Sequence, residues 1–275
     1  MTQSAYRWQI KKAARKAVVL GSLASSSIAM RRLAGSPKVR AITYHRFGHV
    51  DREPWWVPPR VFDEQMHWLA DHSLAVSLDD VVRFARGEID LASGSVLVTI
   101  DDGSSSVFTV AAPILRRYGI PAVAYITTEA IGNPDAGKGA GEPFLTWEQV
   151  GALSAGGMTI GSHSLTHRSM AKLTPGEIRE EGQRSKELIE ANVGKEVTSF
   201  AYPYGMRRDE SPLTEKILAE CGYSSIFIGQ HGTIRRGSNP LRLPRVKVEA
   251  GDPLWMFKLL CAGGMDAWSL ADKVL

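Results

Sequence analysis

The sequence predicts an α/β protein of one domain, a barrel of parallel strands surrounded by helices. Short apolar runs alternate with helix-like stretches from about residue 40 to the end of the chain, with no Pro/Ser-rich linker or internal repeat between them. A chain of 275 residues with 44% hydrophobic residues can bury a core of this size. Several apolar runs also end in polar residues, where parallel barrels place their chemistry.

A basic leader of residues 1–37 precedes this alternation. Its early part is cationic, with Arg7, Lys11, Lys12, Arg15 and Lys16. A weakly apolar run over residues 17–30 follows, which is too short and too rich in serine to cross a bilayer. We therefore expect residues 1–35 to form a basic amphipathic helix that lies on an anionic membrane surface.

The lipid contacts of this helix are expected from its apolar side chains, which are Trp8, Val18, Val19, Leu20, Leu23 and Ile28. The same order of charged and apolar residues also fits an export signal, although no convincing cleavage site precedes Arg31. An inert leader is the third interpretation. A peripheral membrane or cytoplasmic location is thus favoured, with export as the alternative.

The predicted strands are short apolar runs bounded by turn residues or by helices, as expected for strands buried on both faces. They cover residues 40–44, 96–100, 121–127, 158–160, 198–201, 223–228 and 243–248. The run over 96–100 is the clearest, because all five of its residues are apolar or β-branched.

The helices between these strands are predicted from apolar spacing and from capping residues. Phe62, Met66 and Leu69 recur at helical spacing within residues 58–72, and Ser77 is the expected N-cap of a helix over 78–86. Further helices are expected over residues 106–118, from Thr146 to Gly156, over 174–192 and over 214–221.

Two details of this middle region bear on the site. The helix over 174–192 begins with Pro175 and should turn its charged residues toward water, which are Arg179, Glu180, Glu181 and Lys186. Residues 132–141 hold four glycines and a proline, so we expect a surface loop there, one that could cover the site.

Two carboxylates follow the strand over residues 96–100 without a break. Asp101, Asp102 and Gly103 come at its carboxyl end, where α/β barrels bind their ligands. Two adjacent buried carboxylates must be neutralised or put to use, and a metal ion does both. An Asx turn that caps the next helix is the alternative for an isolated D-D-G.

Histidines follow two other predicted strands. His45 comes after residues 40–44, and the pair His163 and His167 comes after residues 158–160. Parallel, adjacent strands would bring these clusters together. Two neutral imidazoles and one carboxylate form an open site for a hydrolytic divalent ion and leave the second aspartate as a base. The four-residue spacing of the histidine pair predicts one helical turn that directs both rings to one ion.

Three motifs resemble those of the polysaccharide deacetylases, also called carbohydrate esterase family 4 or the NodB-homology domain. Residues 99–103, T-I-D-D-G, are similar to the first motif of that family. Residues 163–167, H-S-L-T-H, are similar to the second, and residues 200–205, F-A-Y-P-Y-G, look like the third. The resemblance covers about residues 38–250, and the motifs occur in the order of the family.

The resemblance implies a metal-dependent N-deacetylase with a distorted (β/α)7 barrel, in a domain of residues 38–275. By position, Asp102, His163 and His167 would hold the divalent ion, and Asp101 would be the general base that deprotonates water. The ion would be Zn²⁺, with Co²⁺ or Ni²⁺ as alternatives. The backbone N–H of Tyr204 would help to stabilise the oxyanion that forms at the attacked amide.

The chain departs from the family pattern at two places. Ala201 stands where the third motif often has an arginine, and we expect Arg245 to supply the missing charge beside Asp101. The late L-x-H motif, whose histidine is the general acid, is not recognisable. His45 is the candidate for this role, because residues 44–47 resemble the opening of the subgroup that deacetylates poly-N-acetylglucosamine. His231 lies among glycines and is expected to be a loop residue.

The expected reaction is removal of N-acetyl groups from amino sugars of a surface polysaccharide or oligosaccharide. A deacetylase or deformylase that acts on a lipid-linked amino sugar is the alternative, and the basic leader fits it. A non-catalytic glycan-binding barrel would be expected to lack at least one of the four metal-site residues, and all four are present.

The charge of the chain indicates an anionic surface or substrate rather than a nucleic acid. The net charge of +4 is mild, and no basic helix is interleaved with aromatic residues. Outside the leader, positive charge comes largely from late arginines, which are Arg207, Arg208, Arg235, Arg236, Arg242 and Arg245. Tryptophans that could stack on sugar rings are Trp55, Trp56, Trp147 and Trp255, although a half-buried core position is the commoner outcome.

Overall fold

The computed structural model describes residues 3–24, 38–50, 53–136 and 141–272 of the chain. Its core is a parallel sheet of seven strands within these residues, in the order β8-β7-β6-β5-β4-β1-β9. The strands are β1 (Arg40–Tyr44), β4 (Val96–Ile100), β5 (Ala122–Ile126), β6 (Thr159–Ser162), β7 (Ser199–Ala201), β8 (Ser225–Phe227) and β9 (Arg245–Lys247). Each overlaps a strand predicted from the sequence.

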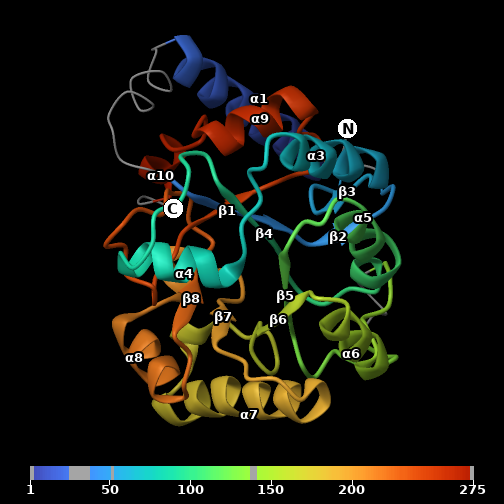
Figure 1. Ribbon diagram of the computed structural model, residues 1–275, viewed down its shortest axis with the longest axis vertical. Coiled ribbons are helices and arrows are strands. Elements are labelled where there is room, and N and C mark those ends of the chain that lie inside the picture. Colours follow the sequence, from blue (N-terminus) through green and yellow to red (C-terminus); the bar gives the residue numbers. More distant parts are fainter. Residues whose placement is uncertain (1–2, 25–37, 51–52, 137–140, 273–275) are drawn as a thin grey trace.

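The sheet curls into a nearly closed barrel with helices around its outside (Figure 1). β1 pairs in parallel with β4 on one side and with β9 on the other. At the remaining seam, Phe227 of β8 forms a parallel bridge with Leu243, which lies just before β9. The prediction of a distorted (β/α)7 barrel is confirmed.

The central strands are buried on both faces, as their continuous apolar runs require. All five residues are buried in each of β1, β4 and β5. Because every pairing in the sheet is parallel, the residues that follow the strands all emerge at one end of the barrel. This topology places the predicted site residues together.

Helices cover the outer face of the sheet: α3 (Pro59–Asp71), α4 (Leu78–Arg86), α5 (Ala112–Arg117), α6 (Trp147–Ala155), α7 (Pro175–Val193), α8 (Pro212–Glu220), α9 (Leu254–Ala262) and α10 (Trp268–Ala271). Ser77 caps α4 as predicted, and its hydroxyl accepts the backbone N–H of Asp80 at 3.1 Å. Thr146 and Thr174 cap α6 and α7 in the same way.

The helix predicted over residues 106–118 begins instead as a π-helical turn, Val107–Ala111, before α5. Pro113 accounts for this, because its nitrogen has no hydrogen to donate to the carbonyl of Thr109. The turn is wider there, and the N–H of Ala112 donates to the carbonyl of Val107. The sequence patterns also did not predict α10 or the short parallel pair β2 (Arg46–Phe47) and β3 (Trp56–Val57).

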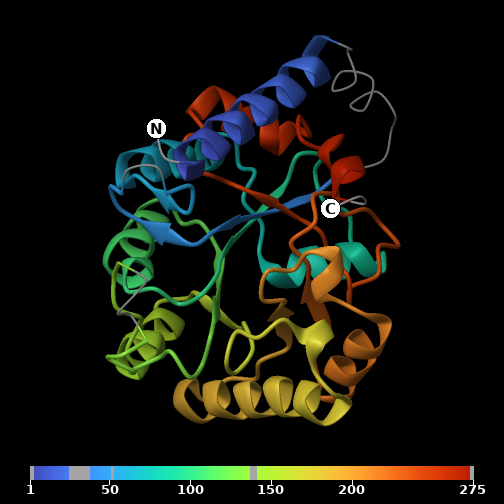
Figure 2. The ribbon, with the colours of Figure 1, turned by 180° about the vertical axis from the view of Figure 1, so that it is seen from behind.

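The leader forms a helix, α1 (Gln3–Ala24), that packs along α9 outside the barrel (Figure 2). Val19 is fully buried in this contact. The Ser22 hydroxyl donates to the carbonyl of Gly264 at 2.9 Å. The helix therefore lies against the folded domain through one of its faces.

This packing corrects part of the expectation for the leader. Val19 was expected to contact lipid, and this is wrong because the protein itself covers the side chain. Leu20, on the outward face, is 52% exposed. The side chains of Trp8, Leu23 and Ile28 lie outside those that the structure describes. Within the described residues, no helix is both long enough and apolar enough to span a membrane.

Candidate active site

The carboxyl ends of the barrel strands surround a cavity of about 290 Å³. Residues in or directly after β1, β4, β6, β7 and β9 supply much of its lining. All seven residues that the sequence singled out line this one cavity: His45, Asp101, Asp102, His163, His167, Tyr204 and Arg245. The predicted convergence of separate strand ends is therefore observed.

Asp101 is the buried carboxylate of the site, directly after β4. Its Oδ1 lies 2.6 Å from Nη1 of Arg245, which is the first residue of β9. Burial raises the pKa of Asp101, but the charges of Arg245 and His163 outweigh burial and hold the pKa below its ordinary value. Asp101 is thus ionised, and Arg245 fixes its position. This confirms the expectation that Arg245 supplies the charge that the family's usual arginine would provide at position 201.

Asp102 points away from this ion pair and toward the two histidines. Its backbone has φ of 74°, a left-handed conformation that costs free energy for a residue other than glycine. The Nε2 atoms of His163 and His167 each lie 3.5 Å from Oδ1 of Asp102. The three groups can each offer one ligand atom, and these atoms lie within 4.8 Å of one another. This arrangement could hold one metal ion.

The electrostatics of the triad favour a cation. Burial raises the pKa of Asp102, yet hydrogen bonds with His163 and His167 hold that pKa well below its ordinary value. Burial lowers the pKa of His163, but the charges of Asp101 and Asp102 more than compensate and raise it. His163 Nδ1 pairs with the carbonyl oxygen of Ala201 at 2.8 Å, which leaves Nε2 as the nitrogen that faces the triad.

The histidine pair lies on a loop, and the prediction of a helical turn between them is wrong. Ser164 and His167 have φ of 69° and 62°, which no regular helix contains. The loop is held by side chains, since the Ser164 hydroxyl accepts the backbone N–H of His167 at 2.9 Å. Both imidazoles reach one point because of this strained loop rather than because of helical periodicity.

Glu181 of α7 is a residue of the site that the sequence analysis placed wrongly. It was expected to face water, but it is almost fully buried beneath the histidine loop. Its Oε2 accepts the backbone N–H groups of Leu165 and Thr166, each at 2.9 Å. The free-energy cost of burying this carboxylate is offset by the hydrogen bonds that it accepts from the loop. The same bonds fix the conformation of the loop.

His45 lies half-buried in the wall of the cavity and packs against Trp55, with ring centroids 4.6 Å apart. Its Nδ1 is buried and has no hydrogen-bond partner among the described residues. Burial lowers the pKa of His45, and the charges of Asp102 and Asp101 offset only part of this effect. The ring thus lines the cavity beside the triad, where a bound substrate would lie.

Tyr204 closes another side of the cavity after β7. Its ring packs on that of His167, with centroids 4.9 Å apart, and its side chain is 58% exposed. The backbone has φ of 62°, and the N–H group donates no hydrogen bond within the described part of the chain. A free backbone donor next to the triad is the element that an oxyanion site needs.

His231 does not contribute to this cavity. It is buried elsewhere, and its Nδ1 lies 2.9 Å from Oδ2 of Asp272, near the C-terminus. Asp272 also accepts the backbone N–H of His231 at 2.7 Å. His231 is therefore a residue that fixes a loop, as the sequence predicted.

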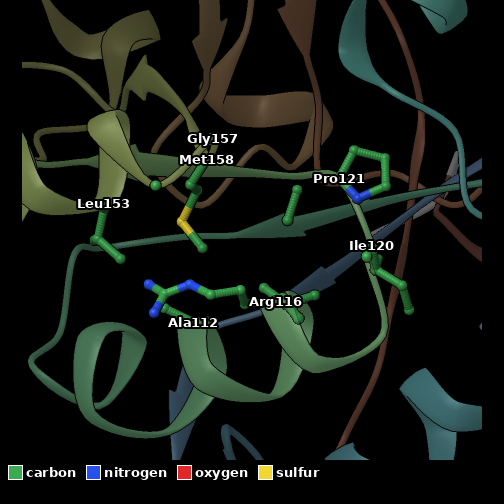
Figure 3. A pocket seen from close by; sticks show the side chains of 11 residues that line it. Ala112, Arg116, Ile120, Pro121, Leu153, Gly157 and Met158 are labelled. Atoms are coloured by element: carbon green, nitrogen blue, oxygen red, sulfur yellow. The ribbon is translucent and has the colours of Figure 1, made fainter.

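A further cavity, of about 460 Å³, lies at the opposite end of the barrel, where β5 and β6 begin (Figure 3). α5 supplies Ala112 and Arg116 to its wall, and Met158 lies across from them. Arg116 is the one charged side chain among its lining residues. The cavity thus lacks the grouped acids and bases found at the carboxyl ends of the strands.

Comparison with known proteins assigns the chain to a protein family. A protein-family model described as polysaccharide deacetylase matches residues 89–226, half of the chain. The chain belongs to the polysaccharide deacetylase family. The matched residues of this deacetylase include both aspartates and both histidines of the triad region, whereas His45 and Arg245 lie outside them.

Two relatives of this deacetylase come from Bacillus subtilis and Staphylococcus aureus. YxkH of Bacillus subtilis (strain 168), a suspected polysaccharide deacetylase, is 26% identical over 242 residues, which are 88% of this chain and 82% of that protein. The poly-β-1,6-N-acetyl-D-glucosamine N-deacetylase of Staphylococcus aureus (strain MRSA252) is 24% identical over 197 residues. That match covers 68% of this chain and 66% of the S. aureus protein.

Solved structures support the same fold for the deacetylase. IcaB from Ammonifex degensii superposes with a TM-score of 0.71 at 27% identity, over 82% of this chain and 97% of that protein. The Streptococcus pyogenes deacetylase PplD, in complex with acetate, gives a TM-score of 0.71 at 21% identity over 80% of this chain and 96% of that protein. The second match bears on the fold alone.

Proposed function

We propose that this polysaccharide deacetylase is a divalent-metal-dependent hydrolase that removes N-acetyl groups from amino sugars of a surface polysaccharide. The observation that carries the proposal is the placement of the Asp102, His163 and His167 triad beside Asp101 in one cavity. A base held next to a three-ligand metal site can carry out metal-assisted hydrolysis of an amide.

The residues of the triad fit a metal ion on their own chemistry. Two imidazole nitrogens and one carboxylate oxygen suit Zn²⁺, and Co²⁺ or Ni²⁺ could replace it. The charges of Asp101 and Asp102 raise the pKa of His163, and the same charges would favour a metal cation at this point. When bound, the ion would polarise the amide carbonyl and lower the pKa of water.

The remaining side chains have distinct tasks in the proposed reaction. Asp101 accepts the proton of the attacking water, because Arg245 keeps it ionised and fixes its position. The free N–H of Tyr204 donates to the oxyanion that forms on the attacked carbonyl. His45, whose side chain lines the cavity beside the triad, protonates the departing amine.

The proposed substrate is an N-acetylated glycan, and the similarity to the S. aureus poly-β-1,6-N-acetyl-D-glucosamine N-deacetylase supports this class. A lipid-linked amino sugar is the alternative substrate. Trp55 lines the cavity next to His45 and offers an aromatic face for a sugar ring.

The direct test incubates purified protein with N-acetylated oligosaccharides and lipid-linked amino sugars and assays both acetate and formate. Chelation should abolish release, and Zn²⁺ or Co²⁺ should restore it. The doubly substituted His163→Ala, His167→Ala protein should be inactive whichever metal is added. Full activity of this variant would overturn the proposal.

We also propose that any contact with an anionic membrane uses the outward face of α1, which presents Leu20. Full-length protein should then sediment with anionic vesicles at low salt, and high salt should release it. Leu20→Glu should weaken this binding. Failure to sediment, or cleavage of the leader on expression, would contradict membrane contact through α1.

A further inference from the structure

A second and wider cavity, of about 640 Å³, adjoins the catalytic one. The two cavities share His167, Tyr204 and Arg208, so they adjoin at these side chains, one of which belongs to the triad. The short helical turns Met170–Lys172 and Arg207–Asp209, which contact each other, form the far wall. We call this second space the side cavity. A group bound in it would lie next to a sugar positioned at the triad.

The side cavity is lined by cations that lack acidic partners. Arg208 borders both cavities, and Lys172 lies in the wall of the side cavity; both are exposed. Neither forms a hydrogen bond or ion pair with an acidic side chain in the described part of the chain. A third cation, Arg168, differs because its charge is balanced by Glu177 and Glu181, at 3.1 and 3.2 Å.

The acidic residue in the lining forms no ion pair with either of these two cations among the described residues. Asp209 is buried, and its Oδ1 accepts the Ser169 hydroxyl at 2.5 Å. Its Oδ2 accepts the backbone N–H of Met206 at 3.2 Å. Both carboxylate oxygens therefore bond within the wall of the side cavity, and among the described residues neither forms an ion pair with Arg208 or Lys172.

We propose that the side cavity is a subsite for an anionic group, a phosphate or a carboxylate, that the substrate carries next to its N-acylated sugar. A guanidinium can bind either oxyanion through two parallel hydrogen bonds, and an ammonium adds a second charge-assisted bond. The inference rests on the proposed deacetylase function and narrows its substrate class to anionic amino-sugar glycans.

The position of Arg208 supports this assignment. Arg208 is the cation that lines both cavities, so an oxyanion paired with it would be held beside the sugar at the triad. The catalytic cavity itself is also bordered by the cation Lys247. A neutral homopolymer would leave Arg208 and Lys172 without partners, whereas an anionic substrate would pair both.

The test compares matched substrates that differ in charge. Acetate release is measured with Zn²⁺-loaded protein on a neutral β-1,6-N-acetylglucosamine oligomer, an oligosaccharide that alternates N-acetylglucosamine with a uronic acid, and an N-acetylglucosamine oligomer that carries a phosphate. Wild-type protein should prefer one of the charged substrates by about 10-fold or more in kcat/KM, and this preference should shrink as salt rises.

The variants Arg208→Gln, Lys172→Gln and the double variant should reduce that preference toward unity, and Arg208→Glu should reverse it. Arg235→Gln is the matched control, because this exposed arginine lies at the other end of the barrel. Its neighbour Ile234 forms a bridge with Val39, just before β1 begins. It should leave the preference as in wild type. Which charged substrate is preferred separates a carboxylate from a phosphate source.

A second measurement does not depend on turnover. Calorimetric titration with N-acetylglucosamine 1-phosphate should show binding that the double variant weakens by about 10-fold, whereas binding of phosphate to the metal alone would survive in that variant. Acetate release without any charge preference would overturn the subsite and leave the deacetylase intact. Binding that depends on Arg208 and Lys172 without acetate release would support the subsite and refute the proposed reaction. The subsite would also be refuted if acetate release did not depend on substrate charge and binding did not depend on Arg208 and Lys172.

Discussion

Arg245 and Asp101 form a buried ion pair across the barrel, with Nη1 and Oδ1 2.6 Å apart although 144 positions separate the two residues in the chain. The guanidinium also approaches the hydroxyls of Thr43 and Thr99, at 3.3 and 3.4 Å. β9, β1 and β4 are neighbours in the sheet, so the register of three strands fixes this contact. The base of the proposed reaction is thereby locked to the core of the fold.

Arg245→Met should damage both stability and catalysis. It leaves the carboxylate of Asp101 buried without its partner, a change that costs about 3–5 kcal/mol of unfolding free energy. Arg245→Lys keeps the charge and should lose less stability, while kcat still falls because a single ammonium does not reproduce the fork of the guanidinium. Denaturant unfolding and kcat of both variants check this. Wild-type kcat in Arg245→Met would refute the role of the ion pair.

The pKa of His45 sets a pH limit for the proposed acid. Burial lowers this pKa below its ordinary value of 6.5, and an acid must be protonated to act. The rate should therefore decline as pH rises through the lowered pKa, within the range below about 6.5. His45→Ala should keep the metal, lose most of kcat and lose this alkaline limb. A pH–kcat profile that keeps the limb in the variant would assign the proton to another donor, such as water.

Glu181 should control metal affinity without touching a ligand. Its carboxylate fixes the two backbone N–H groups that lie between His163 and His167. Glu181→Gln should therefore weaken metal binding by about 10- to 100-fold, the effect typical of groups that orient metal ligands. Glu180→Gln is the matched control, since Glu180 is adjacent and exposed. Competition with a chromogenic chelator measures both, and equal affinities would show that the loop does not need Glu181.

The leader helix should contribute to the stability of the domain through Arg15. This buried guanidinium lies 2.7 Å from Asp252 and 3.4 Å from Glu249, and it donates to the carbonyl of Lys247 at 3.0 Å. Arg15→Met would remove the guanidinium from beside the buried carboxylates of Asp252 and Glu249 and should cost about 3–5 kcal/mol. Lys16→Met, one position along the same helix, should cost much less. Urea unfolding that shows equal stabilities would mean that α1 is not integral to the domain.

The strands and the aspartate pair could be predicted because their signals are local. The continuous apolar run of residues 96–100 and the two carboxylates after it specify a buried strand with a ligand at its end. Arg245 was predicted only because Ala201 left a charge unaccounted for. Caps such as Ser77 were predicted because an N-cap depends on adjacent residues alone.

The histidine loop could not be predicted from local spacing. The left-handed conformations of Ser164 and His167 are maintained by Glu181, which lies on a different element. A signal for Glu181 did exist, because Ile178, Ser185 and Ile189 mark the buried face of α7 and position 181 lies at that face. Its charge had suggested exposure, which is the usual state of glutamate. The side cavity, likewise, depends on two short turns that only the tertiary fold brings together.

The measurement that tests the account most directly determines bound metal and acetate release together in Asp101→Asn and Asp102→Asn. Asp101→Asn should retain the metal and lose rate by a factor on the order of 10² to 10⁴, because it removes the base alone. Asp102→Asn should lose the metal itself, because it removes a ligand. Equal metal loss in the two variants, or undiminished acetate release from Asp101→Asn, would contradict the division of roles on which the proposed function depends.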